Sequence, residues 1–330
     1  MKKLMTGNEA IARGAYEAGV KFASAYPGTP SSEILENIAT YQDHILAEWA
    51  PNEKVALEAV IGASFAGARS MASMKHVGVN VAADPLFTFS YTGVNGGMVL
   101  VTADEPGQHS SQNEQDNRNY AKFAKIPMFE PADSQESKDM IEEAFKVSEA
   151  FDTPVLIRVT TRICHSKGIV ACKDREEVEI KEYVKDLKKN LAVPTFARGM
   201  RVKLEERLQK LLDFSNHTNM NYIEWNDRKI GVIASGTAYR FAKEVFGSAA
   251  SYLKIGFTNP LPIEKIKECS KKKKKIYVIE ENDPYIEEQV RILGFDCYGK
   301  NLFPSYGEMT PDVIRKAVYG ETNSVIEYDK

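Results

Sequence analysis

Short apolar runs alternate with longer amphipathic stretches along the first half of the chain. MVLVTA (98–103) and TPVLIRV (153–159) are apolar almost throughout, which is typical of strands buried on both faces of a sheet. The stretches between such runs have helical spacing, so the alternation predicts a mostly parallel sheet with helices on both faces. The predicted order is helix 7–19, strand 20–25, helix 30–40, strand 45–49, helix 53–70, strand 97–103, strand 127–130, helix 134–150 and strand 153–160.

The pattern changes twice, and these changes divide the chain into three parts. Residues 1–165 are expected to form one α/β domain. Residues 166–228 are polar and read as a connector that contains one helix. From residue 229 the alternation of strand and helix resumes, so residues 229–330 are expected to form a second, smaller α/β domain. The predicted fold class is therefore α/β, with two doubly wound domains.

Composition excludes several classes of protein. The 330 residues are 43% hydrophobic and 27% charged, as in soluble globular proteins of two domains. The net charge of -3 argues against nucleic-acid binding, and the basic run 271–275 is predicted to be a solvated turn. No stretch approaches the roughly 20 apolar residues of a membrane span, and the amino terminus lacks an export signal. A cytoplasmic protein with no membrane partner is expected.

Cysteines and the standard ligand motifs give no positive signal. The four cysteines are far apart and none forms a C-x-x-C pair, so no zinc, iron-sulfur or other metal site is predicted. The chain also lacks G-x-G-x-x-G and G-x-x-x-x-G-K-[ST], and it therefore carries no recognisable phosphate cradle of its own.

Polar segments follow several predicted strands. In open parallel sheets ligands bind just beyond the carboxyl ends of the strands, where helix amino termini and loops gather. We therefore expect these segments along one edge of the sheet: YPGTPSS (26–32), WAPNE (49–53), ADEPGQHSSQNEQDNR (103–118) and TRICHS (161–166).

Two residues at this edge stand at the start of predicted helices. Thr29 is expected to be an N-cap followed by Pro30 at the first helical position, with its hydroxyl facing the edge. Glu53 opens a helix directly after a strand, where a carboxylate interacts favourably with the helix dipole by under about 1 kcal/mol. That structural role alone would explain Glu53. Its rivals Glu48 and Glu58 fall within a strand and in mid-helix, so only Glu53 is expected at the ligand edge.

Other candidates have equally plain structural explanations. His76 and Asn80 flank Gly78 in a predicted loop, and a single loop histidine is more often structural than catalytic. Arg118 and Lys122 are the cations considered for a substrate carboxylate, although both could be ordinary surface charges.

Together these segments resemble one family, the thiamine-diphosphate-dependent 2-oxoacid:ferredoxin oxidoreductases. Within it the chain is most similar to the amino-terminal half of the alpha subunit of the indolepyruvate-specific members. The resemblance covers nearly the whole chain and rests on long strings: GNEAIARGAYEAGV, SAYPGTPSSEI, AEWAPNEKVALEAVIGASFAGAR, MKHVGVNVAADP, HSSQNEQDNRNYAKFAKIPM and, near the carboxyl end, YVIEENDPYIEEQ.

The resemblance implies an aminopyrimidine-binding domain followed by a transketolase-C-like domain. Glu53 matches the family's cofactor-activating glutamate, whose carboxylate bonds a pyrimidine ring nitrogen and favours the tautomer that deprotonates the thiazolium. Thr29 matches a threonine near cofactor and substrate, and Lys122 falls loosely where related enzymes hold the substrate carboxylate. Gly28, His76 and Asn80 are further candidates for cofactor contact.

The resemblance also implies missing parts. Complete alpha subunits continue into a diphosphate-binding domain with a magnesium motif and a ferredoxin-like domain with iron-sulfur clusters. We therefore expect a truncated chain or one half of a split enzyme. By itself it should be inactive, with magnesium, iron-sulfur clusters and coenzyme A used only in the complete enzyme.

The expected partners are those domains or subunits, a beta subunit, ferredoxin and a small 2-oxoacid, in a dimer or larger complex. Two alternatives stay open. One is the beta-type subunit of a lipoamide-linked 2-oxoacid dehydrogenase, and the other is a non-catalytic assembly module.

Overall fold

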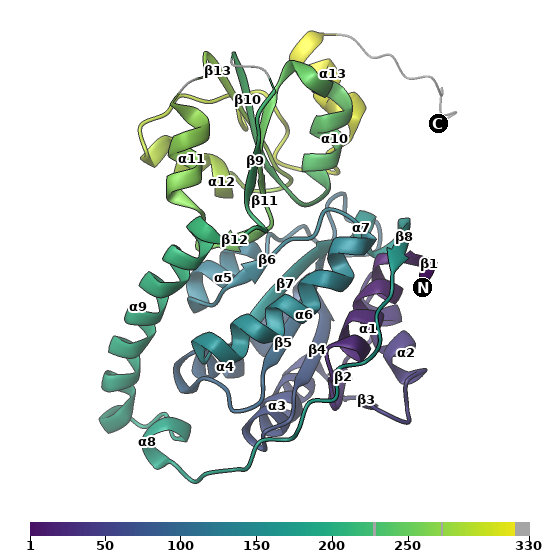
Figure 1. The fold of residues 1–330 in the computed structure, drawn as a ribbon, viewed down its shortest axis with the longest axis vertical. Coiled ribbons are helices and arrows are strands. Elements are labelled where there is room, and N and C mark those ends of the chain that lie inside the picture. Colours follow the sequence, from purple (N-terminus) through teal and green to yellow (C-terminus); the bar gives the residue numbers. More distant parts are fainter. Residues whose placement is uncertain (227–228, 272, 321–330) are drawn as a thin grey trace.

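A seven-stranded sheet forms the centre of the first α/β unit in the computed structural model, which describes residues 1–226, 229–271 and 273–320 (Figure 1). Six of its strands are parallel, and the edge strand β12, from the second half of the chain, pairs antiparallel with β6. In sheet order the strands are β12 (Phe257–Asn259), β6 (Met128–Phe129), β7 (Val155–Thr160), β5 (Met98–Asp104), β4 (Ser70–Lys75), β2 (Phe22–Ala25) and β3 (Leu46–Trp49).

Helices cover both faces of this sheet. Strand β5 shows why, because Val99 and Val101 belong to one buried cluster and Leu100 to the opposite one. An unbroken apolar run therefore supplies two cores at once. One face packs against α1 (Gly7–Glu17), α2 (Ser32–Ala39) and α6 (Ser134–Phe151), and the other against α3 (Glu53–Phe65), α4 (His76–Thr92) and α5 (Arg118–Ala124).

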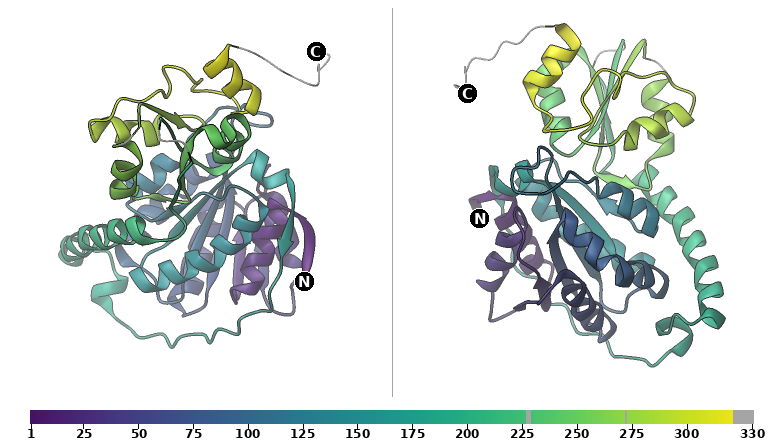
Figure 2. Two further views of the ribbon diagram at one scale, coloured as in Figure 1. Left: turned by 45° about the horizontal axis from the view of Figure 1, so that its top comes forward. Right: turned by 180° about the vertical axis from the view of Figure 1, so that it is seen from behind.

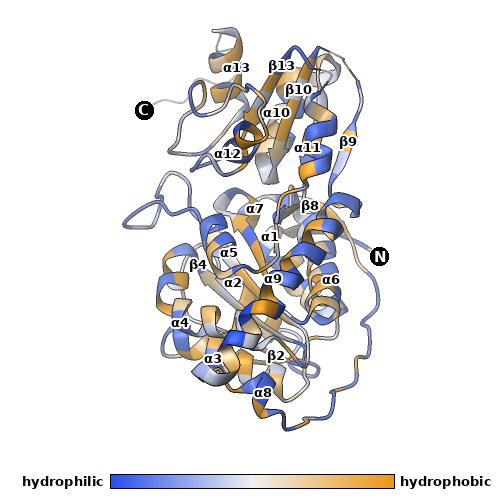
Figure 3. Cartoon of the chain, turned by 90° about the vertical axis from the view of Figure 1, so that its left-hand side faces the viewer, coloured by the Kyte–Doolittle hydropathy of each residue, from blue (hydrophilic) through white to orange (hydrophobic). Residues whose placement is uncertain are grey.

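The second α/β unit has a smaller sheet of four strands. Three of them are parallel and β9 is antiparallel to β11. Figure 3 shows β10 and β13 as predominantly hydrophobic strands. Their order is β13 (Lys275–Ile279), β10 (Ile230–Ser235), β11 (Ser251–Ile255) and β9 (Tyr222–Glu224), and the helices are α10 (Gly236–Phe246), α11 (Ile263–Ser270), α12 (Tyr285–Ile292) and α13 (Pro311–Tyr319).

The segment between the units is more ordered than the sequence predicts. β8 (Lys167–Ala171) follows the short helix α7 (Thr161–His165) and pairs antiparallel with β1 (Lys2–Thr6). After α8 (Leu187–Asn190), the helix α9 (Pro194–His217) runs from the base of the first unit to the second (Figures 1 and 2). Neither α9 nor any other helix in the described ranges is long and apolar enough to cross a membrane.

The structure confirms the predicted α/β class but corrects one region. The helix predicted for residues 53–70 ends at Phe65, because Gly67 adopts a φ of +95°, a left-handed conformation that stops a helix and favours glycine. Residues Ser70–Lys75 then form β4, which the sequence did not predict. The loop predicted around His76 and Asn80 is wrong, since both lie in α4.

Candidate functional site

The carboxyl ends of the parallel strands lie at one edge of the large sheet, and the second unit covers part of it. Asp104 at the end of β5 and Thr160 at the end of β7 are buried there. The ends of β2, β3 and β4 are less covered: Tyr26 and Trp49 are 39% and 46% exposed, and Lys75 at the end of β4 is half-buried. We call this less covered part, the carboxyl ends of β2, β3 and β4 with the residues that follow them, the open edge.

Glu53 lies at the open edge as the first residue of α3. Asn52 caps the helix by accepting a hydrogen bond from the Val55 amide at 3.0 Å. The half-buried Glu53 side chain lies against Gly78 of α4, where a Cβ atom would be 2.7 Å from both Cγ and Oε1 of Glu53. Only glycine at position 78 leaves room for this carboxylate, which has no hydrogen-bond or ion-pair partner among the described residues.

The turn after β2 closes on Gly28 rather than on Thr29. The Gly28 amide donates to Ser32 Oγ at 2.8 Å, and Ser31 Oγ donates to the Gly28 carbonyl at 2.8 Å. Helix α2 begins at Ser32 with Ser31 at the N-cap position, so the prediction that Thr29 caps this helix is wrong. The two serines satisfy the turn, and Thr29 remains exposed beside Gly28 with a cis bond to Pro30.

The first turns of α4 carry the two residues predicted to lie in a loop. His76 is fully buried, and its Nε2 lies 3.0 Å from the Asn113 carbonyl oxygen. Since a carbonyl only accepts, Nε2 carries the proton, and Nδ1 is left as a buried acceptor without a partner. Asn80, one turn further, is exposed and its Oδ1 accepts from Tyr120 Oη at 2.5 Å.

The segment 105–117 borders the same region and connects it to the second unit. Glu105 Oε1 accepts from the Ser110 amide at 2.9 Å, and its other oxygen accepts from Ser111. Burial opposes ionisation of Glu105, but these hydrogen bonds and the nearby Lys75 charge still lower its pKa. Glu114 accepts from the amide of Gly307 in the second unit at 2.9 Å.

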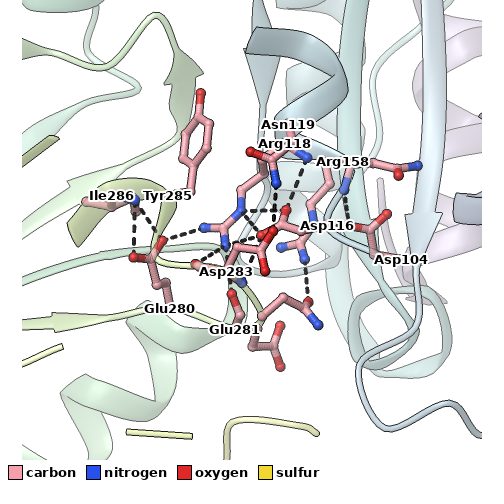
Figure 4. A network of polar contacts seen from close by, with 12 residues as sticks. Asp104, Asp116, Arg118, Asn119, Arg158, Glu280, Glu281, Asp283, Tyr285 and Ile286 are labelled. Atoms are coloured by element: carbon pink, nitrogen blue, oxygen red, sulfur yellow. Dashed lines mark hydrogen bonds and ion pairs between the residues drawn. The ribbon is translucent and has the colours of Figure 1, made fainter. Parts of the chain in front are cut away.

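Arg118 is not available to a substrate. Its side chain is fully buried, with ion pairs of 2.6 Å to Asp116 and 2.7 Å to Glu280 of the second unit (Figure 4). The interpretation of Arg118 as a substrate cation is therefore wrong, because these carboxylates already neutralise the guanidinium. Burial raises the pKa of Glu280, whereas the Arg118 charge lowers the pKa of Asp116 against the effect of its own burial.

A second buried arginine extends this network. Arg158 pairs with Asp104 and Glu130, each at 2.8 Å. Burial raises the pKa of Asp104 to about 6, and burial raises the pKa of Glu281 to about 7. We call the set of buried charges between the two units the inter-unit network: Asp104, Asp116, Arg118, Glu130, Arg158, Glu280 and Glu281.

Lys122 faces the second unit instead of Glu53. Its side chain is 60% exposed on α5, and its ammonium lies 3.7 Å from Glu288 of α12. It also borders a pocket of about 240 Å³ together with Pro260 and Tyr285. The structure therefore gives no support to its predicted contact with a substrate at the open edge.

The sequence analysis did not identify Lys75, nor the Ser110 and Asn113 carbonyl groups that contact Lys75 and His76. Lys75 is the last residue of β4, and its ammonium donates to the Ser110 carbonyl at 3.2 Å. It was missed because β4 itself was not predicted: the helix was expected to run to residue 70, and only the short string MASMK follows it. One sequence feature could have identified it: Lys75 directly precedes an apolar stretch with helical spacing, residues 76–92.

Comparisons with known proteins agree with this fold. The family model described as pyruvate flavodoxin/ferredoxin oxidoreductase, thiamine diphosphate-binding, matches residues 13–211. "Indolepyruvate oxidoreductase subunit IorA" of Archaeoglobus fulgidus is 44% identical over 311 residues, which cover 91% of this chain and 50% of the relative. The chain spans about half the length of this and other curated relatives that it matches.

Two solved structures share the arrangement of both units. The 2-oxoglutarate:ferredoxin oxidoreductase of Magnetococcus marinus superposes with a TM-score of 0.77 at 19% identity, covering 97% of this chain and 65% of the other. A split-gene transketolase, described as an inactive beta4 tetramer, gives 0.60 at 14% identity and covers 96% and 97%. The fold likeness and the match over residues 13–211 agree, and the chain belongs to the pyruvate flavodoxin/ferredoxin oxidoreductase family of thiamine-diphosphate-binding proteins.

Proposed function

We propose that this chain is the pyrimidine-side part of a thiamine-diphosphate-dependent 2-oxoacid:ferredoxin oxidoreductase. The reaction is the oxidative decarboxylation of indolepyruvate or a related arylpyruvate to the acyl-CoA, with release of carbon dioxide and transfer of two electrons to ferredoxin. The family match and the names of the similar proteins support this proposal. The observation that carries it is the position of Glu53 at the head of α3, against Gly78 at the open edge.

The described residues fit an aminopyrimidine. Such a ring presents nitrogen atoms that accept, one of which can share a proton with a carboxylate, and an exocyclic amino group that donates to neutral acceptors. Glu53 offers a carboxylate without a protein partner, and His76 Nδ1 is a buried acceptor that nothing in the described chain satisfies. We propose that Glu53 and His76, with Gly28, Thr29 and Asn80, hold the pyrimidine side of the cofactor.

Glu53 has the central role in the proposed chemistry. Thiamine diphosphate, when bound, supplies a carbon nucleophile and an electron sink for decarboxylation. With the cofactor bound, the Glu53 carboxylate would hold a proton at a pyrimidine ring nitrogen and so would raise the basicity of the exocyclic nitrogen. The absence of a side chain at Gly78 gives the Glu53 carboxylate the space that it occupies. The exposed Thr29 hydroxyl is positioned to contact the substrate from the turn after β2.

The other half of the site would come from a partner. Large apolar side chains remain exposed around the open edge and on the nearby helices α3, α4 and α5: Trp49 at 46%, Val55 at 40%, Val81 at 48% and Phe123 at 75%. Exposed apolar side chains on these neighbouring elements support a covering partner if they form one continuous surface. We propose that a diphosphate-binding domain covers it and that the partner polypeptides also carry the magnesium and iron-sulfur sites.

The proposal is tested in the assembled complex. The chain is combined anaerobically with the polypeptides that supply the remaining half of the relatives, thiamine diphosphate, magnesium and coenzyme A, and 2-oxoacid-dependent reduction of ferredoxin is measured. Glu53→Gln is expected to lower the rate by about 10²- to 10⁴-fold, because it removes a general acid-base contribution. Glu58→Gln is the matched control, since Glu58 is exposed on the same helix.

A second readout separates activation from turnover. Exchange of the thiazolium C2 proton with deuterium in the bound cofactor should slow in Glu53→Gln and not in Glu58→Gln. Equal exchange and equal turnover in the two variants would contradict the proposal. Reduction of lipoamide in place of ferredoxin would favour the 2-oxoacid dehydrogenase alternative.

A further inference from the structure

A lysine that no sequence motif identifies lies where the open edge meets the covered part of the sheet. Lys75 ends β4, which pairs with β2 on one side and β5 on the other. Its aliphatic stem packs on Gly28, where a Cβ atom would lie 3.0 Å from Cδ of Lys75. The missing side chain at position 28 therefore allows the half-buried lysine to lie beside Thr29.

The Lys75 ammonium is not neutralised by an ion pair with any described carboxylate. Its one hydrogen bond is to the Ser110 carbonyl at 3.2 Å. The Lys75 charge contributes to the lowered pKa of Glu105, but the oxygens of that carboxylate accept hydrogen bonds from Ser110 and Ser111. A cation that is half-buried and bound to a neutral carbonyl alone retains capacity for a strong, charge-assisted hydrogen bond.

The surroundings of Lys75 also favour an anion. Lys75 is followed by the 17-residue helix α4, so the free amides of the first turn add partial positive charge at this point. Glu53 packs against Gly78 of that same turn. The start of α4 therefore lies next to both a carboxylate suited to a nitrogen ring and an ammonium suited to an acid group.

We propose that Lys75 binds the carboxylate of the substrate and thereby selects 2-oxoacids over neutral carbonyl compounds. This inference rests on the proposed function and replaces Arg118 and Lys122 as candidates for that contact. Arg118 forms its ion pairs within the inter-unit network, and the Lys122 ammonium lies near Glu288 of α12. The stem of Lys75 instead packs on Gly28, and α4, whose Gly78 lies against Glu53, begins at the next residue.

The test compares Lys75→Met with Lys122→Met in the assembled complex. Methionine keeps an unbranched stem against Gly28 and removes the charge. We expect Lys75→Met to raise KM for the 2-oxoacid about 10- to 100-fold, the range of a hydrogen bond to a charged group, with a smaller change in kcat. Lys122→Met should leave both constants unchanged.

Inhibitors give a readout that a purely structural role would not change. The 2-hydroxyacid that corresponds to the substrate should inhibit Lys75→Met more weakly than the wild type, by the same factor as the change in KM. The amide of that acid should inhibit both proteins equally. If acid and amide lose affinity together, Lys75 shapes the site without recognising the carboxylate, and the inference is wrong.

The outcomes also separate this inference from the proposed function. If the wild-type complex shows no 2-oxoacid-dependent reduction of ferredoxin, the proposed function fails. If the wild type is active and Lys75→Met keeps its KM, only the assignment of Lys75 fails. Should Lys75→Met not fold, Lys75→Gln serves in its place, since glutamine also removes the charge. An unchanged KM in this variant overturns the inference.

Discussion

Glu53 owes its position to the absence of a side chain opposite it. Its Cγ and Oε1 occupy the volume that a Cβ atom on Gly78 would fill. Gly78 lies inside α4, where glycine costs roughly 1 kcal/mol relative to alanine, so the helix itself gives no reason for it. The close approach of the carboxylate supplies that reason, and the residue pair is best treated as one unit of the site.

Gly78→Ala should therefore separate activity from stability. The new Cβ would lie 2.7 Å from the Glu53 side chain and force it to rotate, while the helix gains propensity. We expect at least about tenfold slower turnover, since the misplaced carboxylate loses its role as acid and base. Steady-state kinetics and thermal melting check this, with a melting temperature equal to or above that of the wild type.

Gly199→Ala in α9 is the matched control, because nothing lies within 4 Å of the Cβ that it adds. It should gain stability without losing rate. A fully active Gly78→Ala protein would show that Glu53 need not stay where it lies in this structure.

At the scale of elements, the site depends on how helices start. Helix α3 begins at Glu53 because Asn52 caps it, and α4 begins directly after the last residue of β4. These two junctions place a carboxylate, an imidazole and an ammonium within the first turns of neighbouring helices. A strand that ends one residue earlier or later would turn those side chains to different directions.

Asn52→Ala tests the first junction. Loss of the cap at the Val55 amide should lower the free energy of unfolding by about 0.5–2 kcal/mol, and should lower turnover because the start of α3 frays. Chemical denaturation and steady-state kinetics measure the two effects. Asn52→Ser, which retains a capping oxygen, should recover most of both. If Ala and Ser behave alike, the Asn52 cap does not position Glu53.

For the whole molecule, the inter-unit network holds the two α/β units together with buried charge. Arg118 bonds Glu280 across the interface, and Arg158 bonds Asn282 Oδ1 at 3.2 Å (Figure 4). Such networks depend on every partner, since a buried charge left alone is costly. Contact between the units therefore also fixes the segment 105–117 that borders the open edge.

Arg118→Met should destabilise the protein strongly. It leaves Asp116 and Glu280 buried without their cation, which typically costs about 3–5 kcal/mol. Thermal melting and limited proteolysis between the units check this expectation. Arg201→Met is the control, because Arg201 pairs with Glu205 on an exposed helix face and such a pair is worth about 1 kcal/mol or less. Similar melting temperatures for the two variants would contradict the role of the network.

The same network predicts a pH dependence. The pKa of Glu281 rises from 4.5 to about 7 on folding, so the folded protein binds more protons than the unfolded chain within that window. The free energy of unfolding should then fall as pH rises from about 4.5 to 7, by at most about 1.4 kcal/mol per pH unit for this group. The raised pKa of Asp104, from 3.8 to about 6, likewise makes the free energy of unfolding fall as pH rises within that range.

Glu281→Gln should remove the part of this slope between about pH 6 and 7, since glutamine stays neutral and keeps an oxygen for the Met309 amide. Denaturation with urea at a series of pH values measures it. An unchanged slope in the variant would mean that Glu281 does not titrate in this range.

Much of the fold followed from local pattern, and part of the site did not. The strands 97–103 and 153–160 and the helix that opens at Glu53 were predicted because apolar spacing and flanking residues act over a few positions. β4 was missed because the helix that opens at Glu53 was expected to run to residue 70, which leaves only MASMK before the next predicted segment. His76 was consequently assigned to a loop instead of the buried first turn of α4.

The sequence by itself determined the α/β class, the alternation of strand and helix, and the presence of Glu53 at a helix start, because these depend on neighbours in the chain. Only the tertiary structure decided that Arg118 forms an ion pair with Glu280 and that Gly78 leaves room for Glu53. It also decided that Lys75 forms no ion pair with a carboxylate among the described residues. Those outcomes depend on side chains that are far apart in the sequence and meet only when the sheet and its helices pack. Charge pairing and close packing act through space, so residue order alone does not record them.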